Sequence, residues 1–191
     1  MIHFLKGPFF ELTPTLVVVD CGGIGYEAKI SLNTYEELVR TNADIVYTQL
    51  IVREDAQVLY GFAAKEEKDI FNLLISVSGI GPNTALIMLS SLKTSDIANA
   101  IIHEDLRTIQ AIKGIGAKTA QRVIIELKDK MLKLDVSSSN SLSPNNTNRF
   151  DALSALLSLG FDRKAIDKAM DKIDDGVKTV EVLIKEALKI L

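Results

Sequence analysis

The sequence SGIGPNTA at residues 78–85 and the sequence KGIGAKTA at residues 113–120 share one pattern, which decides the predicted fold. Each segment lies between two stretches whose apolar residues recur at helical spacing, so each predicts two helices joined by a Gly-Ile-Gly turn. Glycine permits the positive φ of a tight turn and leaves its backbone N–H groups unshielded. These groups precede a helix N-terminus, where orphan donors and the helix dipole favour an anion. The repeat therefore predicts two helix-hairpin-helix units that bind phosphate.

Phosphate contacts of this kind hold a nucleic-acid backbone without reading the bases. One Gly-x-Gly turn alone is explained as well by a plain connection between packed helices, and it is the second copy that favours DNA. Lys118 and Arg122 lie one turn apart on the helix after the second turn and add two cations. The predicted DNA-binding residues are Gly79, Ile80, Gly81, Pro82, Asn83, Thr84, Gly114, Ile115, Gly116, Ala117, Lys118, Thr119 and Arg122.

Other functions fit the sequence less well. The segment GIGAKT at 114–119 has the wrong spacing for a nucleotide-binding P-loop, because position 111 is Ala and Gly116 is followed by Ala117. Gly-Gly-Ile-Gly at 22–25 lies between predicted strands, which disfavours a dinucleotide site. A hairpin-bearing nuclease or glycosylase is the enzymatic alternative, and a protein-only scaffold leaves the repeated phosphate pattern unexplained. We expect no catalytic residue, metal site or cofactor.

Residues 1–62 are predicted to consist of strands. β-branched and alternating segments are separated by Gly-rich or charged turns, which is typical of a small closed barrel such as the OB-fold. The strands are expected at residues 16–19, 26–30, 45–52 and 56–60. Glu54 and Asp55 then form the acidic tip of a hairpin.

The remaining chain is predicted to be helical in two parts. Residues 63–134 hold both hairpins, and residues 149–191 predict three short helices in a small UBA-like domain. Between them, residues 135–148 contain no Lys or Arg and almost no apolar side chains, which predicts a flexible linker. The fold class is therefore α+β and multidomain, with an N-terminal OB-fold barrel, an all-α double helix-hairpin-helix domain, a tether and a helical tail.

Composition agrees with a folded intracellular protein. The chain has 191 residues, 47% of them hydrophobic, and a net charge of −3, which excludes global disorder. Residues 63–134 carry ten basic against eight acidic side chains, whereas residues 1–62 carry four against eight, so the hairpin region is the electropositive part. A single cysteine, Cys21, and two histidines predict neither disulfide nor zinc cluster. With no secretory signal or long apolar run, we expect a cytoplasmic location and no membrane partner.

The segment VREDAQVLYGF at 52–62 ends the predicted barrel. Followed by two hairpins, a linker and a three-helix tail, it resembles the bacterial RuvA family, the Holliday-junction-binding subunits of the branch-migration machine. The resemblance covers the chain apart from the linker. It implies a homotetramer, with the octamer left open, that holds four-way junction DNA open and square without sequence specificity.

The resemblance also implies roles for residues outside the hairpins. Glu54 and Asp55 would form an acidic pin at the crossover, where carboxylates repel phosphates and divide the strands; the alternative is an ordinary solvated turn. Leu156, Leu159 and Phe161 would contact the hexameric ATPase RuvB, although leucines at helical spacing are usually core. The nuclease RuvC is implied as an indirect partner. Family hairpins often carry Lys where Asn83 and Ala117 stand here, which predicts weaker or less salt-sensitive binding.

Overall fold

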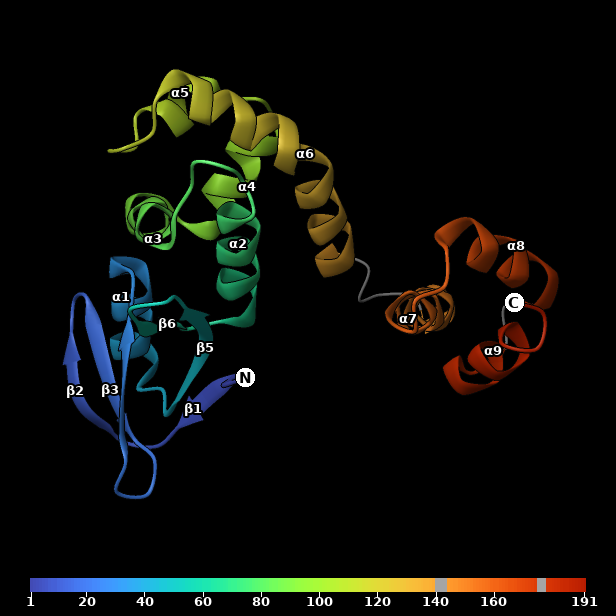
Figure 1. The fold of residues 1–191 in the computed structure, drawn as a ribbon, viewed down its shortest axis with the longest axis horizontal. Coiled ribbons are helices and arrows are strands. Elements are labelled where there is room, and N and C mark those ends of the chain that lie inside the picture. Colours follow the sequence, from blue (N-terminus) through green and yellow to red (C-terminus); the bar gives the residue numbers. More distant parts are fainter. Residues whose placement is uncertain (140–143, 175–177) are drawn as a thin grey trace. The chain divides into compact units, whose positions relative to one another are not determined.

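The computed structural model describes the backbone of residues 1–139, 144–174 and 178–191, and the side chains of residues 1–132, 148–149, 151–163, 165–174 and 178–191. The chain forms two compact units, Met1–Leu132 and Lys133–Leu191 (Figure 1). The first unit contains the sheet and both hairpins, and the second contains the C-terminal helices.

The sheet of the first unit has six strands in the order β1-β5-β6-β4-β3-β2. Neighbouring strands are antiparallel except β4 and β6, which are parallel. Val17, Val19, Ala28 and Val46 are fully buried and form the core of this sheet. The strands are β1 (Phe4–Lys6), β2 (Phe9–Thr13), β3 (Leu16–Asp20), β4 (Gly25–Lys29), β5 (Ile45–Val52) and β6 (Gln57–Phe62), of which the last four correspond to the predicted strands.

The two ends of the sheet meet at Gly7 and Pro8, because β1 and β2 are the outermost strands yet only these two residues separate them. The backbone N–H of Gly7 donates to Asp44 O at 2.9 Å, and Asp20 N–H donates to Pro8 O at 3.0 Å. A Cβ on Gly7 would lie 2.0 Å from Asp20 O, so this corner requires glycine. The sheet thus curls into the predicted OB-type barrel.

The prediction that residues 1–62 consist only of strands is wrong, because α1 (Leu32–Thr41) lies between β4 and β5. Ser31 is its N-cap and accepts from Thr34 N–H at 3.0 Å. Asn42 ends the helix in the left-handed conformation, with φ 49°. Serine before a helix and asparagine after it are the ordinary start and stop signals of sequence analysis.

Five helices follow the barrel in the first unit. Their core is apolar and fully buried, with Phe71, Leu74, Met88 and Leu127 among its largest members. No single described helix is long and apolar enough to cross a membrane, although α3 and α4, bent by 100°, pass that test together by length and composition only. The helices are α2 (Lys65–Ile75), α3 (Pro82–Ser91), α4 (Thr94–Ile102), α5 (Leu106–Gln110) and α6 (Ala117–Ser139).

Glu67, on the first turn of α2, joins the barrel to the hairpin region. Although its neighbour Glu66 is exposed at the same helix start, Glu67 is only 7% exposed. Its Oε1 accepts from Ser31 Oγ at 3.0 Å and from Thr34 Oγ1 at 2.6 Å, and its Oε2 accepts from Ala63 N–H at 3.1 Å. Burial raises the pKa of the Glu67 carboxyl above its ordinary 4.5, and these hydrogen bonds lower it in part. The carboxylate thereby ties α2 to the start of α1.

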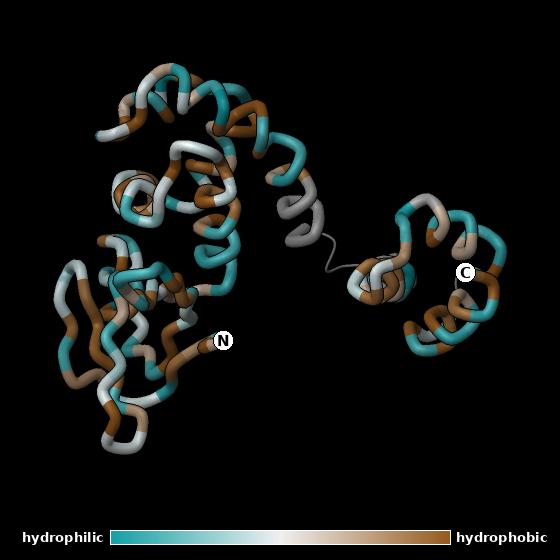
Figure 2. The backbone as a smooth tube through the Cα atoms, viewed as in Figure 1, coloured by the Kyte–Doolittle hydropathy of each residue, from teal (hydrophilic) through white to brown (hydrophobic). Residues whose placement is uncertain are grey.

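The second unit holds three helices, α7 (Pro144–Ser158), α8 (Arg163–Ile173) and α9 (Val180–Ala187). Hydrophobic and hydrophilic residues alternate along α8 and α9 (Figure 2), and the buried members form one small core. Arg149 on α7 donates to Asp171 at 2.6 Å and to Asp174 at 3.2 Å. This ion pair fixes α7 against the end of α8.

The predicted linker at 135–148 stays a prediction. Helix α6 continues to Ser139 and α7 begins at Pro144, so the helices extend into this segment from both sides. Residues 140–143 between them lie outside the described residues.

Candidate nucleic-acid interface

The first hairpin joins α2 to α3. Ile80 N–H donates to Val77 O at 3.0 Å, and Ala85 N–H donates to Gly81 O at 2.9 Å. Gly79, between these bonds, has a φ of 96°, in the left-handed region that favours glycine. The turn therefore delivers the chain directly into the first turn of α3, as the Gly-Ile-Gly pattern predicts.

The second hairpin repeats this geometry between α5 and α6. Ile115 N–H donates to Ile112 O at 3.1 Å, and Ala120 N–H donates to Gly116 O at 2.9 Å. Gly114 has a φ of 90°, close to that of Gly79. The sequence repeat is thus a structural repeat, in which the two hydrogen bonds of the first turn recur at the equivalent residues of the second.

Some residues of the two turns are buried, and the glycines that precede the helices are exposed. Ile80, Pro82 and Ile115 are buried, so the side chains of these three predicted DNA-binding residues are not available to DNA. The N–H groups of Ile80 and Ile115 are already bonded within the turns, and proline has none, so these residues shape the turns. Gly81 and Gly116 are exposed, and a Cβ on either would meet nothing within 4 Å. The first-turn N–H groups after these glycines are the orphan donors of a helix N-terminus. A phosphate can therefore approach both helix ends closely.

The two hairpins form one continuous face. Arg122 Nη1, on α6, donates to Ser78 O of the first turn at 3.3 Å. A Cβ on Gly79 would lie 3.8 Å from the side chain of Thr119. Contact between the two turns holds the N-termini of α3 and α6 next to each other.

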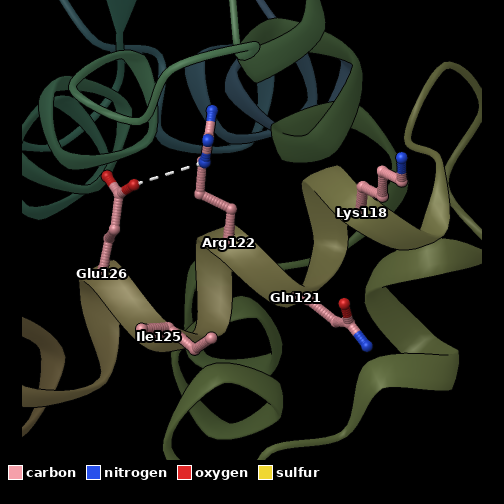
Figure 3. Close-up of a pocket in the computed structure, with 5 residues that line it drawn as sticks. All are labelled: Lys118, Gln121, Arg122, Ile125 and Glu126. Atoms are coloured by element: carbon pink, nitrogen blue, oxygen red, sulfur yellow. Dashed lines mark ion pairs between the residues drawn. The ribbon is translucent and has the colours of Figure 1, made fainter.

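Positive charge is distributed unequally over this face. Lys113 and Lys118 beside the second turn are exposed, and no ion pair among the described side chains involves either. Arg122 is partly neutralised, since its Nε lies 3.6 Å from Glu126 Oε1 (Figure 3). A surface pocket of about 250 Å³ lies along the same helix, lined by Lys118, Gln121, Arg122, Ile125 and Glu126. The first turn, residues 78–84, contains no cation and relies on its N–H donors.

Asn83 and Ala117, where the resemblance predicts lysines, differ in their surroundings. Asn83 Oδ1 accepts from the Tyr60 hydroxyl at 3.3 Å, so its side chain is already engaged by the barrel. Ala117 is exposed at the start of α6. A lysine at position 117 therefore tests the missing cation more cleanly than one at position 83.

We expect Ala117→Lys to tighten DNA binding and to steepen its salt dependence by about 0.9 in the log–log slope, because one more phosphate contact releases one more counterion. The measurement is a titration of duplex DNA at several salt concentrations. Ala165→Lys, at an exposed alanine of the second unit, makes the same charge change and should leave the slope unaltered. Equal slopes for both variants would contradict the prediction.

The acidic tip lies where the sequence predicts it, in the turn between β5 and β6. Arg53 N–H donates to Ala56 O at 2.8 Å, which makes Glu54 and Asp55 the two central residues of a tight, exposed turn. No ion pair among the described side chains involves either carboxylate. The tip is thus available to act on charge outside the chain.

The predicted motor-binding residues do not form one exposed patch. Leu156 is fully buried in the core of the second unit, because it lies on the face of α7 that packs against the other two helices, so its predicted exposure is wrong. Phe161 is half-buried against the same core. Leu159 is 61% exposed, and Leu157, which sequence analysis missed, is 40% exposed.

These features define a tandem helix-hairpin-helix protein built on an OB-fold barrel, with a separate helical C-terminal unit. Family models match each part: "RuvA N terminal domain" at residues 1–61, "SAM-like Helix-hairpin-helix tandem" at 71–129 and "RuvA, C-terminal domain" at 147–191. The chain belongs to the RuvA family.

Curated relatives match over nearly their whole length. The proteins from Christiangramia forsetii and Flavobacterium psychrophilum are each 53% identical over 191 residues, covering 99% of both chains. The protein from Cytophaga hutchinsonii is 46% identical over 197 residues, again covering 99% of both. Each is named "Holliday junction branch migration complex subunit RuvA".

Proposed function

We propose that this chain is a non-catalytic, structure-specific DNA-binding subunit that holds four-way junctions open and square for branch migration. The observation that carries the proposal is the pair of hairpins with matching turn hydrogen bonds and φ angles, joined by the Arg122–Ser78 bond. Two N–H-lined helix ends at fixed spacing suit two phosphates of one duplex arm. The names of the full-length relatives support the same conclusion.

Recognition of shape and not of sequence follows from this chemistry. Backbone N–H donors bind phosphate oxygens, which are the same at every base pair. The exposed glycines at the turns carry no side chain that could reach a base edge. Among the described residues, no group of three or more His, Cys, Asp or Glu could hold a metal ion, and the proposed subunit has no ATPase or nuclease site of its own.

In the proposed assembly, four copies of the chain form a cytoplasmic homotetramer, each holding one arm. The barrels, residues 1–62, form the centre, and the hairpin domain, residues 63–134, binds DNA. The tail, residues 149–191, docks the RuvB ATPase through a surface that includes Leu159, with residues 135–148 as the tether. RuvC acts on the junction so presented.

The proposal is tested by gel-shift titration at near-physiological salt, comparing a synthetic four-way junction with a linear duplex of one arm's sequence. We expect a strong preference for the junction. Equal or absent binding would contradict junction recognition. Incubation of the labelled junction with the chain and Mg²⁺, without partners, tests the non-catalytic part, because strand cleavage or base loss would reveal an enzyme.

Neutralising the acidic tip should tighten junction binding. In Glu54→Gln with Asp55→Asn, two exposed carboxylates that repel the crossover phosphates are lost, so we expect the junction dissociation constant to fall about threefold at low salt. The control, Glu36→Gln with Asp151→Asn, removes the same charge from exposed positions elsewhere. If the tip variant keeps both the wild-type affinity for the junction and the wild-type preference for junction over duplex, the acidic tip has no role in junction recognition.

A further inference from the structure

Helix α3 carries the first phosphate-binding turn at its N-terminus, and the barrel holds this helix at both ends. At the C-terminal end, Asn33 Nδ2 donates to Leu89 O at 2.6 Å and to Leu92 O at 2.9 Å. At the N-terminal end, the Tyr60 hydroxyl donates to Asn83 Oδ1 at 3.3 Å. Asn33 lies on α1 and Tyr60 on β6, so two separate elements of the barrel clamp one helix.

The Asn33 contact uses groups that the helix itself leaves without partners. The last carbonyls of a helix lack intrahelical donors, and here both amide hydrogens of one side chain satisfy two carbonyl oxygens at the end of α3. Beside them, Leu32 N–H donates to Ser90 Oγ at 3.1 Å. Asn33 therefore caps a helix that belongs to the hairpin domain. Figure 1 shows α1 at the end of the barrel that faces α3.

The other connection from the barrel to the hairpins acts at a distance from the turns. Among residues 1–132, every hydrogen bond between the barrel and the hairpin domain ends on α2 or α3 or on the segment joining them to the sheet. The α2 contacts are made by Glu67 and Lys68, in its first turn. The hairpin follows the last turn of this helix, about 12 Å from Glu67 at 1.5 Å per residue. On α3, the Tyr60–Asn83 bond acts next to the phosphate-binding end, and Asn33 fixes the opposite end of the same ten-residue helix, so that the two together set the direction of its axis.

We infer that Asn33 is a positioning residue for junction recognition, which sets the hairpins at a fixed place relative to the acidic tip of the barrel. This inference rests on the proposed function. Duplex binding needs only the two hairpins, and these are joined to each other through Arg122 and Ser78. A four-way junction presents a duplex arm and the strand crossover together. Its recognition therefore needs the hairpins and the acidic tip of the barrel at a fixed distance and orientation to each other. Loss of the Asn33 contacts therefore weakens binding to the junction more than binding to a duplex.

The test is Asn33→Asp, a substitution of nearly equal shape that replaces the NH2 group, which carries both donor hydrogens, by a carboxylate oxygen. We expect the ratio of duplex to junction dissociation constants to fall about tenfold, the equivalent of one to two hydrogen bonds, while duplex affinity changes less than about twofold. A purely structural role would lower the folded fraction and weaken both complexes equally, leaving the ratio unchanged. Asn99→Asp, at an exposed residue of α4, makes the same charge change and should leave both constants unaltered.

Tyr60→Phe provides a second variant should Asn33→Asp fail to fold. It removes one hydroxyl and keeps the ring packed against Phe71, whose centroid lies 5.2 Å away. The expected change is a fall in the same ratio. Retention of the wild-type ratio in the folded variants overturns the inference and leaves the proposed function standing. A wild-type chain without junction preference overturns the proposed function, and the inference with it.

Discussion

Replacing Gly81 and Gly116 together by aspartate is expected to abolish DNA binding while making the fold more stable. Both glycines precede a helix, and both have open space where a Cβ would lie. Aspartate is among the best N-cap residues, and because glycine is itself an acceptable one, the exchange should add about 0.3 kcal/mol per helix to the free energy of unfolding. Its carboxylate would occupy the N–H donors that bind phosphate and would repel the phosphate itself. We expect junction affinity to fall about a hundredfold or more.

The matched control is Gly81→Asn with Gly116→Asn. Asparagine caps a helix about as well as aspartate but carries no charge, so it should raise stability equally and weaken binding less. Gel-shift titration and urea unfolding of the three proteins separate the two effects. Wild-type junction affinity in the aspartate variant would show that the hairpin turns are not the phosphate site.

The second large effect, on the free energy of unfolding, is expected from substitution of Glu67. Substitution by alanine removes the acceptor of the buried hydroxyls of Ser31 and Thr34 and of the part-buried N–H of Ala63. Each such loss costs about 1 kcal/mol or more, so we expect the free energy of unfolding to fall by about 3 kcal/mol. All four tyrosines lie within residues 26–60, and the chain has no tryptophan, so tyrosine fluorescence during urea unfolding reports on the first unit alone.

The Glu67 variant should also show a specific pH dependence. Because burial raises the pKa of this carboxyl in the folded state, wild-type stability from Glu67 is greatest below the ordinary pKa of 4.5 and declines as pH rises through the folded-state pKa. The alanine variant lacks this titration, so its deficit should be larger at pH 5 than at pH 8. Glu66→Ala, at the exposed neighbour, should change stability little at either pH. A constant deficit would contradict the raised pKa.

Local sequence patterns were sufficient for much of this structure. The two Gly-Ile-Gly turns, their positive φ angles and their place before helices were predictable because glycine, a helix start and apolar spacing are all local properties. Strands β3 to β6 and the exposed acidic turn followed from β-branched runs and charged breaks. The order of these parts also indicated the family correctly.

Features that depend on tertiary contact escaped prediction. Glu67 stands beside Glu66 in sequence, and only the approach of Ser31 and Thr34 distinguishes the buried carboxylate from the solvated one. Leu156 and Leu159 are both leucines of one helical stripe, yet one is core and the other exposed. Helix α1 is different, because its Ser31 and Asn42 signals were present locally and were overlooked among strands.

The unequal charge of the two hairpins has a mechanical consequence. In the proposed complex, the first turn would hold phosphate by neutral N–H dipoles alone, whereas the second would add the side chains of Lys113 and Lys118. A contact with an N–H dipole is short-ranged. When one phosphate leaves it, the N–H groups bond to the next phosphate or to water, and no counterion has to bind to the protein or the DNA in exchange. For a duplex arm that must advance while it is held, the first hairpin would then release its phosphate easily, and the charged second hairpin would keep the arm bound.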